Sequence, residues 1–248
     1  MIFNIVRKEL KSVFASPMGW IVLTIFTFLF GSLYLTGVNN YFEVMSGAVR
    51  PAERMGVTQS VGQIVYGWAF LIVLVAVPLL SMRLISEERR SQTLPFLFSA
   101  PLSLTEIVLG KFFGLVIFLS ILILYIAFML STLNIWSDVD FGFIMANSLG
   151  LFLLVAGSSA VGLYFSSLTS QPVAAAVMSF VTLIALIFMD RIFVADPSNP
   201  LAQFSLMRHF QSFSTGLIDT ADIAYFVLFT ITFLTLTIRR LDADRLRG

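Results

Sequence analysis

The sequence predicts an all-α integral membrane protein with six transmembrane helices, and three observations support this. Hydrophobic residues make up 58% of the 248 residues and charged residues only 12%, whereas soluble domains are about 45–50% apolar and about 25% charged. The mean hydropathy is +0.95. Six long stretches contain no Asp, Glu, Lys, Arg or His: Met18–Val38, Ile64–Met82, Phe112–Leu133, Phe141–Phe165, Val173–Met189 and Ile223–Ile238. Lipid is therefore the expected solvent for much of the surface.

Each stretch approaches the roughly 20 residues that a helix needs to cross about 30 Å of hydrocarbon. Met18–Val38 is too long for a signal-peptide core and no clear cleavage site follows it, so we expect an uncleaved first span. Pro78 is expected to kink the second span. Small residues allow close helix packing in the fourth and fifth spans, within one subunit or between subunits. They are Gly157, Ser158, Ser159, Gly162, Ala174, Ala175 and Ala176.

The distribution of Lys and Arg predicts the orientation. Eleven of these residues lie in the N-terminal segment, in the loop between the second and third spans and in the C-terminal tail, and four lie in the opposite loops. The positive-inside rule then places both termini in the cytoplasm, and residues 190–222 outside it. This extracytoplasmic segment is expected to form short helices at or within the outer leaflet. The composition, without cysteine, fits a multi-pass protein of the bacterial inner (cytoplasmic) membrane.

Residues 2–16 are predicted to form an amphipathic helix at the membrane interface. Apolar residues recur at helical spacing, namely Phe3, Val6, Leu10 and Val13. Arg7, Lys8 and Lys11 fall on the other faces, and Pro17 limits continuation into the first span. The alternative is a segment that only anchors the cytoplasmic side by its positive charge.

Several kinds of chemistry find no support. The predicted spans hold no ionisable residue, which disfavours an ion-coupled carrier. Gly110-Lys111 resembles the end of a phosphate-binding loop, but Thr105 and Phe112 replace its essential Gly and Ser/Thr. The only histidine, His209, cannot form a His-based metal site alone and is expected to pack or to hydrogen-bond. We expect no catalytic centre, no bound metal or cofactor and no nucleic-acid partner.

The loop after the second span contains the features that point to a function. Glu87-Glu88 precede Arg89-Arg90, the order that the dipole of a short helix favours. The apolar residues that follow are too few to span a membrane: Leu94, Phe96, Leu97 and Phe98. This loop is either an interfacial helix dipping into lipid or a docking site for a soluble protein, with apolar anchors and a charged rim.

Three segments of this region resemble the first cytoplasmic loop of ABC-2 type permeases: Glu87–Leu94 (EERRSQTL), Ala100–Ser103 (APLS) and Glu106–Lys111 (EIVLGK). The whole chain resembles, more narrowly, the gliding-motility-type (GldF-like) permeases. Further stretches support this likeness: Arg7–Leu10 running to Ser16-Pro17, Phe165–Ser170, and His209–Phe213 with Gly216 and Asp219.

The resemblance implies that residues 1–248 form a single ABC-2 type transmembrane domain, with a coupling helix in the loop 86–100 between the second and third spans. It also implies a non-catalytic permease of the exporter type. This permease pairs with a second permease (a second copy or a paralogue) and with two copies of a separate ATPase subunit that binds ATP and Mg. Gln92 stands where these loops often carry Gly, and Pro95 where an acidic residue is common. Pro95 is expected to end or bend the coupling helix.

We therefore predict an ATPase contact at Glu87, Glu88, Arg89, Arg90 and Thr93, with Leu94, Phe96 and Leu97 as apolar anchors. Arg7, Lys8 and Lys11 are predicted to lie beside this contact at the membrane surface. Membrane lipids and an accessory envelope protein are further expected partners. The alternative function is a membrane anchor or scaffold of an envelope or motility-type machine that moves no solute.

Overall fold

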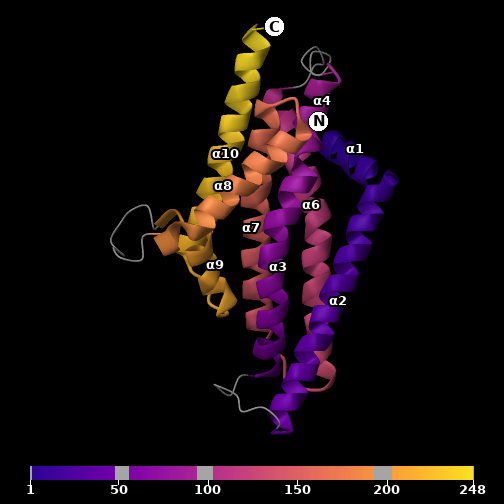
Figure 1. Ribbon diagram of the computed structural model, residues 1–248, viewed down its shortest axis with the longest axis vertical. Coiled ribbons are helices and arrows are strands. Elements are labelled where there is room, and N and C mark those ends of the chain that lie inside the picture. The colour runs from indigo at the N-terminus through magenta and orange to yellow at the C-terminus, as the bar shows by residue number, and fades with distance from the viewer. Residues whose placement is uncertain (1, 48–55, 94–102, 193–202, 248) are drawn as a thin grey trace.

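The protein is an elongated bundle of α-helices (Figure 1). This computed structural model describes residues 2–47, 56–93, 103–192 and 203–247. Six helical stretches in these ranges are long and apolar enough to cross a membrane: Gly19–Met45, Val57–Arg90, Leu104–Ile135, Phe141–Leu168, Pro172–Met189 and Thr220–Leu246. They coincide with the six predicted spans, so the prediction of an all-helical protein with six membrane-crossing helices is confirmed.

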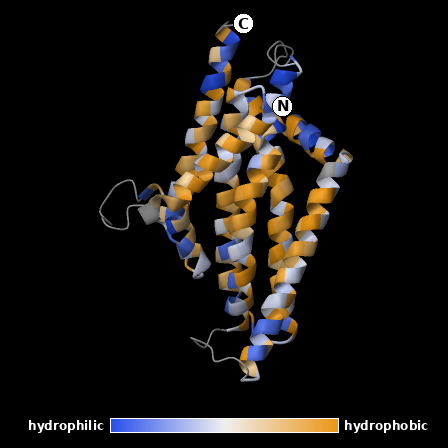
Figure 2. Cartoon of the chain, in the orientation of Figure 1, coloured by the Kyte–Doolittle hydropathy of each residue, from blue (hydrophilic) through white to orange (hydrophobic). Residues whose placement is uncertain are grey.

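The long helices are α2 (Pro17–Met45), α3 (Val57–Ser81), α6 (Leu104–Ser131), α7 (Phe141–Leu168), α8 (Pro172–Ile192) and α10 (Thr220–Arg247). The shorter elements are α1 (Ile2–Ala15), α4 (Arg83–Arg90), the 3-10 turn η1 (Thr132–Ile135) and α9 (Leu206–Ser214). Both chain ends lie at the end of the bundle that carries α1 and α4 (Figure 1). Figure 2 shows a hydrophobic middle section with hydrophilic residues gathered towards the two ends and on α9.

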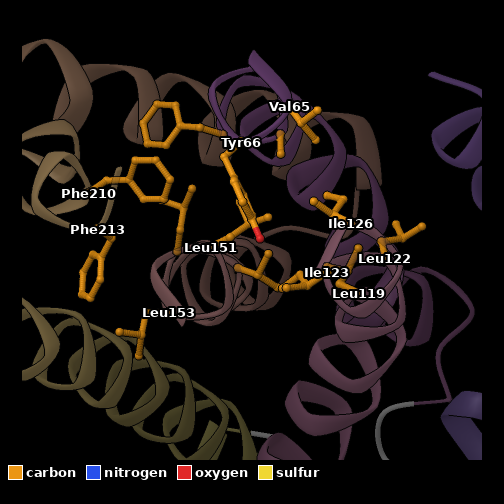
Figure 3. Close-up of a cluster of buried hydrophobic side chains, with 14 of the residues drawn as sticks. Val65, Tyr66, Leu119, Leu122, Ile123, Ile126, Leu151, Leu153, Phe210 and Phe213 are labelled. Atoms are coloured by element: carbon orange, nitrogen blue, oxygen red, sulfur yellow. The ribbon is translucent and has the colours of Figure 1, made fainter. Parts of the chain in front are cut away.

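Helix α7 forms the centre of the bundle. In its apolar span 72% of the residues are buried, compared with 56% in α3 and α6 and 11% in α2. Figure 3 shows side chains of α3, α6 and α9, Tyr66 of α3 among them, gathered around α7 and its Leu151. The buried Tyr66 hydroxyl donates to the carbonyl oxygen of Ile144 at 3.2 Å and lies 2.6 Å from Ser148 Oγ. The core thus satisfies a polar group that would be costly to bury alone.

Glycines let neighbouring elements approach α7 closely. A Cβ atom added at Gly150 would lie 2.6 Å from Phe213 Cβ, and one at Gly157 would lie 3.1 Å from Phe229 Cδ1. At Gly162 the added atom would overlap the side chain of Ser81 in α3. The small residues of the fourth span therefore serve tight packing within one subunit, the first of the two predicted alternatives.

Side chains next to the helix ends explain where two spans begin. Ser103 Oγ accepts the backbone N–H of Glu106 at 3.2 Å, while Glu106 accepts the N–H of Ser103 at 3.1 Å, forming a capping box at the start of α6. Asp140 accepts the N–H of Phe143 at 3.0 Å at the start of α7. Its own N–H donates to Thr58 Oγ1 at 3.1 Å, which joins this cap to the first turn of α3.

The segment between α8 and α10 folds back onto the bundle. Helix α9 buries Leu206, Phe210 and Phe213. The Phe210 ring lies 4.7 Å from that of Phe70 in α3, and Phe213 packs on Gly150 in α7 (Figure 3). Since Phe70 and Gly150 lie well inside their spans, α9 reaches into the depth of the apolar section instead of resting on the end of the bundle.

Replacing Gly162 by Ala is expected to lower the free energy of unfolding by about 1–3 kcal/mol, because the added methyl group pushes α7 away from Ser81. Thermal or denaturant unfolding of the purified protein in detergent measures this. Gly67→Ala is the matched control, since a Cβ at Gly67 in α3 has no neighbour within 4 Å. There the helix propensity of Ala favours equal or higher stability. Equal losses in both variants would contradict the close α3–α7 contact.

Candidate functional site

Helix α1 lies across the beginning of α6 (Figure 1). A Cβ atom added at Gly110 would lie 2.5 Å from Ile5 Cγ2, and one at Gly114 would lie 2.8 Å from Glu9 Cβ. These two glycines are four residues apart and therefore share one face of α6. They leave a shallow strip on α6 that the side chains of Ile5 and Glu9 of α1 fill, with no space for a side chain at either glycine.

A buried lysine between these glycines joins three elements. Lys111 of α6 is only 4% exposed. Its Nζ donates to Glu9 Oε1 of α1 at 3.2 Å and to Glu88 Oε1 of α4 at 2.7 Å. We call Lys111, Glu9 and Glu88 the Lys111 cluster. An ammonium this deeply buried is tolerated only when it is paired, so the cluster fixes α1 and α4 relative to α6.

The opposite side of α4 is attached to α7 and α10. Arg89 donates to the carbonyl oxygen of Ser167 at 2.6 Å and forms an ion pair with Asp244 of α10. Ser166 Oγ accepts the N–H groups of Ile85 and Ser86, each at 3.0 Å. These N–H groups belong to the first turn of α4, which has no acceptors within its own helix. A serine of α7 therefore caps α4.

The end of α4 is a tight backbone turn. The N–H of Thr93 donates to the carbonyl oxygen of Glu88 at 3.0 Å, and that of Gln92 donates to Arg89 at 3.3 Å. Gln92 has a φ of 55°, a left-handed conformation that favours glycine. This explains structurally why glycine suits this position in similar loops. The helix thus ends at Arg90, upstream of Pro95, which lies outside the described residues.

The structure divides the predicted ATPase contact into two groups. Glu87, Arg90 and Thr93 are exposed, whereas Glu88 and Arg89 are partly buried in the ion pairs just described. Arg7, Lys8 and Lys11 are all exposed on α1. The predicted anchors Leu94, Phe96 and Leu97 lie outside the described residues.

A second polar cluster joins α9 to α10. The His209 ring stacks on Tyr225 with 3.9 Å between ring centroids, and its Nδ1 lies 2.6 Å from Asp222 Oδ1. His209 Nε2 lies 2.8 Å from the carbonyl oxygen of Gln203. A carbonyl oxygen only accepts, so Nε2 carries a proton, and the bond to Asp222 holds either a second ring proton or the proton of the carboxyl group. His209 therefore packs and hydrogen-bonds, as predicted.

The sequence reasoning missed the partners in both clusters. The sequence analysis places Lys111 in the cytoplasmic loop before the third span, whereas the structure places it inside α6. A charged residue directly before an apolar run is a signal for a buried ion pair, because the helix can begin upstream of the run. Asp222 stands in the same way directly before Ile223. The local sequence does not predict which residues are contacted by Glu9, Ser166 and Asp244.

The comparison with family profiles matches residues 3–246 to the ABC-2 family transporter protein family. The chain belongs to this family. A search of curated proteins found no match. The ABC-2 chain is accordingly the multi-pass membrane component of an ABC transporter, a permease subunit, and members of this family generally work with an ABC ATPase.

Replacing Lys111 of this permease by Met leaves the carboxylates of Glu9 and Glu88 close together without their shared cation. We expect the free energy of unfolding to fall by about 1–3 kcal/mol. Denaturant unfolding in detergent measures the loss. The control is Arg83→Met, an exposed cation of α4, for which we expect a change within about 0.5 kcal/mol. Equal effects of both substitutions would show that the cluster contributes nothing specific.

Replacing His209 by Phe keeps a ring on Tyr225 but removes both hydrogen bonds and leaves Asp222 buried without its partner. We expect a loss of about 1–3 kcal/mol in the free energy of unfolding. In the double variant H209F/D222N the second substitution removes the unpaired carboxylate. Unfolding of the four proteins of this cycle is therefore expected to give a coupling energy of about 1 kcal/mol or more. Strictly additive losses would contradict a direct His209–Asp222 interaction.

Proposed function

We propose that this chain is the permease of an ATP-driven exporter and that its separate ATPase subunit docks on α4 and the loop that follows. ATP and Mg bind to that subunit, and closure of two ATPase copies moves α4. In this proposal the docked end of the bundle faces the cytoplasm, and the membrane is the inner membrane of a bacterium. The proposed gliding-motility-type subfamily rests on the sequence resemblance of the whole chain to GldF-like permeases.

One observation carries the proposal: α4 is charged and exposed on one side and connected to three other helices on the other. Glu87 and Arg90 are exposed and available to a partner. Glu88 joins α4 to α6 and α1 through Lys111, and Arg89 joins it to α10. A displacement applied at the exposed side is therefore passed to α6 and α10, because α4 forms a direct ion pair with each of these two long helices.

The packing of α4 against α7 strengthens this proposal. Helix α7 is the most buried helix of the bundle, and Ser166 and Ser167 near its end bind α4 directly. Since α7 also contacts α3, α9 and α10, it distributes a displacement of α4 over the bundle. In this proposal the transporter also contains a second permease subunit, which is a copy or a paralogue of this chain. An accessory envelope protein is a further partner of the complex.

A cavity of about 660 Å³ between α3, α7, α8 and α9 supports transport over the scaffold alternative. Its volume lies within the roughly 300–1,000 Å³ typical of small-molecule sites. The buried Asn147 lines it, and Asn147 Oδ1 has no hydrogen-bond partner in the described part of the chain. Its lining residues in the described part of the chain are uncharged: Gln63, Tyr66, Gly67, Phe70, Leu71, Asn147, Ile187, Phe188, Met207, Phe210, Gln211, Ser214 and Thr215.

The direct test is affinity purification of the permease from its native membranes in mild detergent, followed by mass spectrometry and an ATPase assay. The proposal expects a stoichiometric soluble ATPase and vanadate-sensitive hydrolysis. Purification without any nucleotide-binding partner, together with no hydrolysis after reconstitution with the products of neighbouring genes, would overturn the proposal and favour a scaffold.

Glu87→Lys is expected to lower the amount of copurified ATPase about tenfold, because it reverses a charge at the docking surface. Glu88 is unsuitable for this purpose because its loss also breaks the Lys111 cluster. Asp242→Lys is the control, since Asp242 is exposed on the last turns of α10 near the same end of the bundle. Equal recovery of the ATPase with both variants would place the docking surface elsewhere.

A further inference from the structure

A second cavity, of about 340 Å³, lies where α1 meets the α3–α4 junction and α6. It has a charged part and an apolar part. The charged residues are Lys8, Glu9, Arg83, Glu87, Glu88 and Lys111. The apolar wall is formed by Val13, Leu79, Leu80 and Leu84. This combination, next to the apolar section of the bundle, is suited to the headgroup and upper chain of an amphiphile.

Within this cavity, the Lys111 cluster contains one carboxylate more than it has cations. Two carboxylates share a single ammonium, so the cluster carries one net negative charge when all three groups are ionised. Glu88 Oε2 is buried and has no hydrogen-bond partner in the described ranges. A buried carboxylate oxygen without a donor is costly. Glu88 lines the cavity, so a small rotation of its carboxylate would present this oxygen to a positively charged N–H group bound there.

The rim of the cavity provides the complementary charges. Lys8 and Arg83 line the cavity from α1 and α4, and both are exposed. Neither forms an ion pair with another residue described in the structure. Lys and Arg are the usual partners of phosphate groups. The exposed Glu87, also on the rim, adds a second acceptor for an ammonium group.

We propose that this cavity binds the phosphoethanolamine headgroup of a membrane phospholipid. The lipid ammonium donates to Glu88 Oε2 and to Glu87, the phosphate accepts from Lys8 and Arg83, and the acyl chains follow Leu79 and Leu80 into the apolar layer. A free phosphate ion would leave Glu88 without a donor, and a metal ion would meet the ammonium of Lys111. A trimethylated headgroup has the same charge but no N–H donor.

Native mass spectrometry of the full-length permease in detergent tests this proposal with three lipids of identical acyl chains: phosphatidylethanolamine, phosphatidylcholine and phosphatidylglycerol. We expect phosphatidylethanolamine to bind about tenfold more tightly than the other two, since it alone offers both the N–H donors and the phosphate. Equal affinity for phosphatidylcholine would overturn the role of the ammonium. Equal affinity for phosphatidylglycerol would reduce the site to a phosphate site and would also overturn the proposal.

Two variants locate the binding. E88Q is expected to abolish the preference for phosphatidylethanolamine, and K8Q/R83Q is expected to weaken binding of this lipid about tenfold. D242N removes an exposed carboxylate outside the cavity and should retain wild-type binding. If E88Q fails to fold, K8Q/R83Q decides, since both of its residues are exposed. Wild-type affinity for phosphatidylethanolamine in K8Q/R83Q would refute the site. The test needs no ATPase, so its result is independent of the proposed function.

Discussion

The buried ammonium of Lys111 is the constraint on which the arrangement of this end of the molecule depends. Its two carboxylate partners stand 102 and 23 residues away in the sequence, on α1 and α4. An unpaired ammonium at this depth would cost several kcal/mol, so α1 and α4 must both reach α6. Gly110 and Gly114 make this possible by letting α1 approach the α6 backbone. Packing and charge thus specify the same arrangement, which is typical of a structure that forms uniquely.

The same constraint fixes which side of α4 faces the bundle and which side is exposed. Successive residues of an α-helix point about 100° apart, so Glu87 and Arg90 can be exposed while Glu88 and Arg89 are turned towards the bundle. Ser166 adds the acceptor that the first turn of α4 lacks. The helix therefore cannot rotate or tilt without breaking bonds to α6, α7 or α10. Such a short helix would be unstable alone, and its tertiary bonds are what hold it in place.

The sequence predicts the features that depend on local composition and not those that depend on distant partners. The apolar runs locate all six spans because a membrane-crossing helix is specified by its own length and hydropathy. The same criterion starts two spans too late. It begins the third span at Phe112 and the sixth at Ile223, directly after Lys111 and Asp222, but α6 begins at Leu104 and α10 at Thr220. Their partners could not be predicted, because nothing local to Lys111 indicates Glu9.

The two polar clusters act in the same way on different short helices. Helix α1 packs on glycines of α6, and α9 packs on Gly150 of α7. Apolar contacts against glycine are non-directional and permit sliding, so they leave the register of a short helix undetermined. An ion pair or charged hydrogen bond has a fixed length and direction, and each short helix has one: Glu9 with Lys111, and His209 with Asp222. Movement of either short helix along its glycine contacts therefore requires its polar bond to break or the bonded partner to move with it.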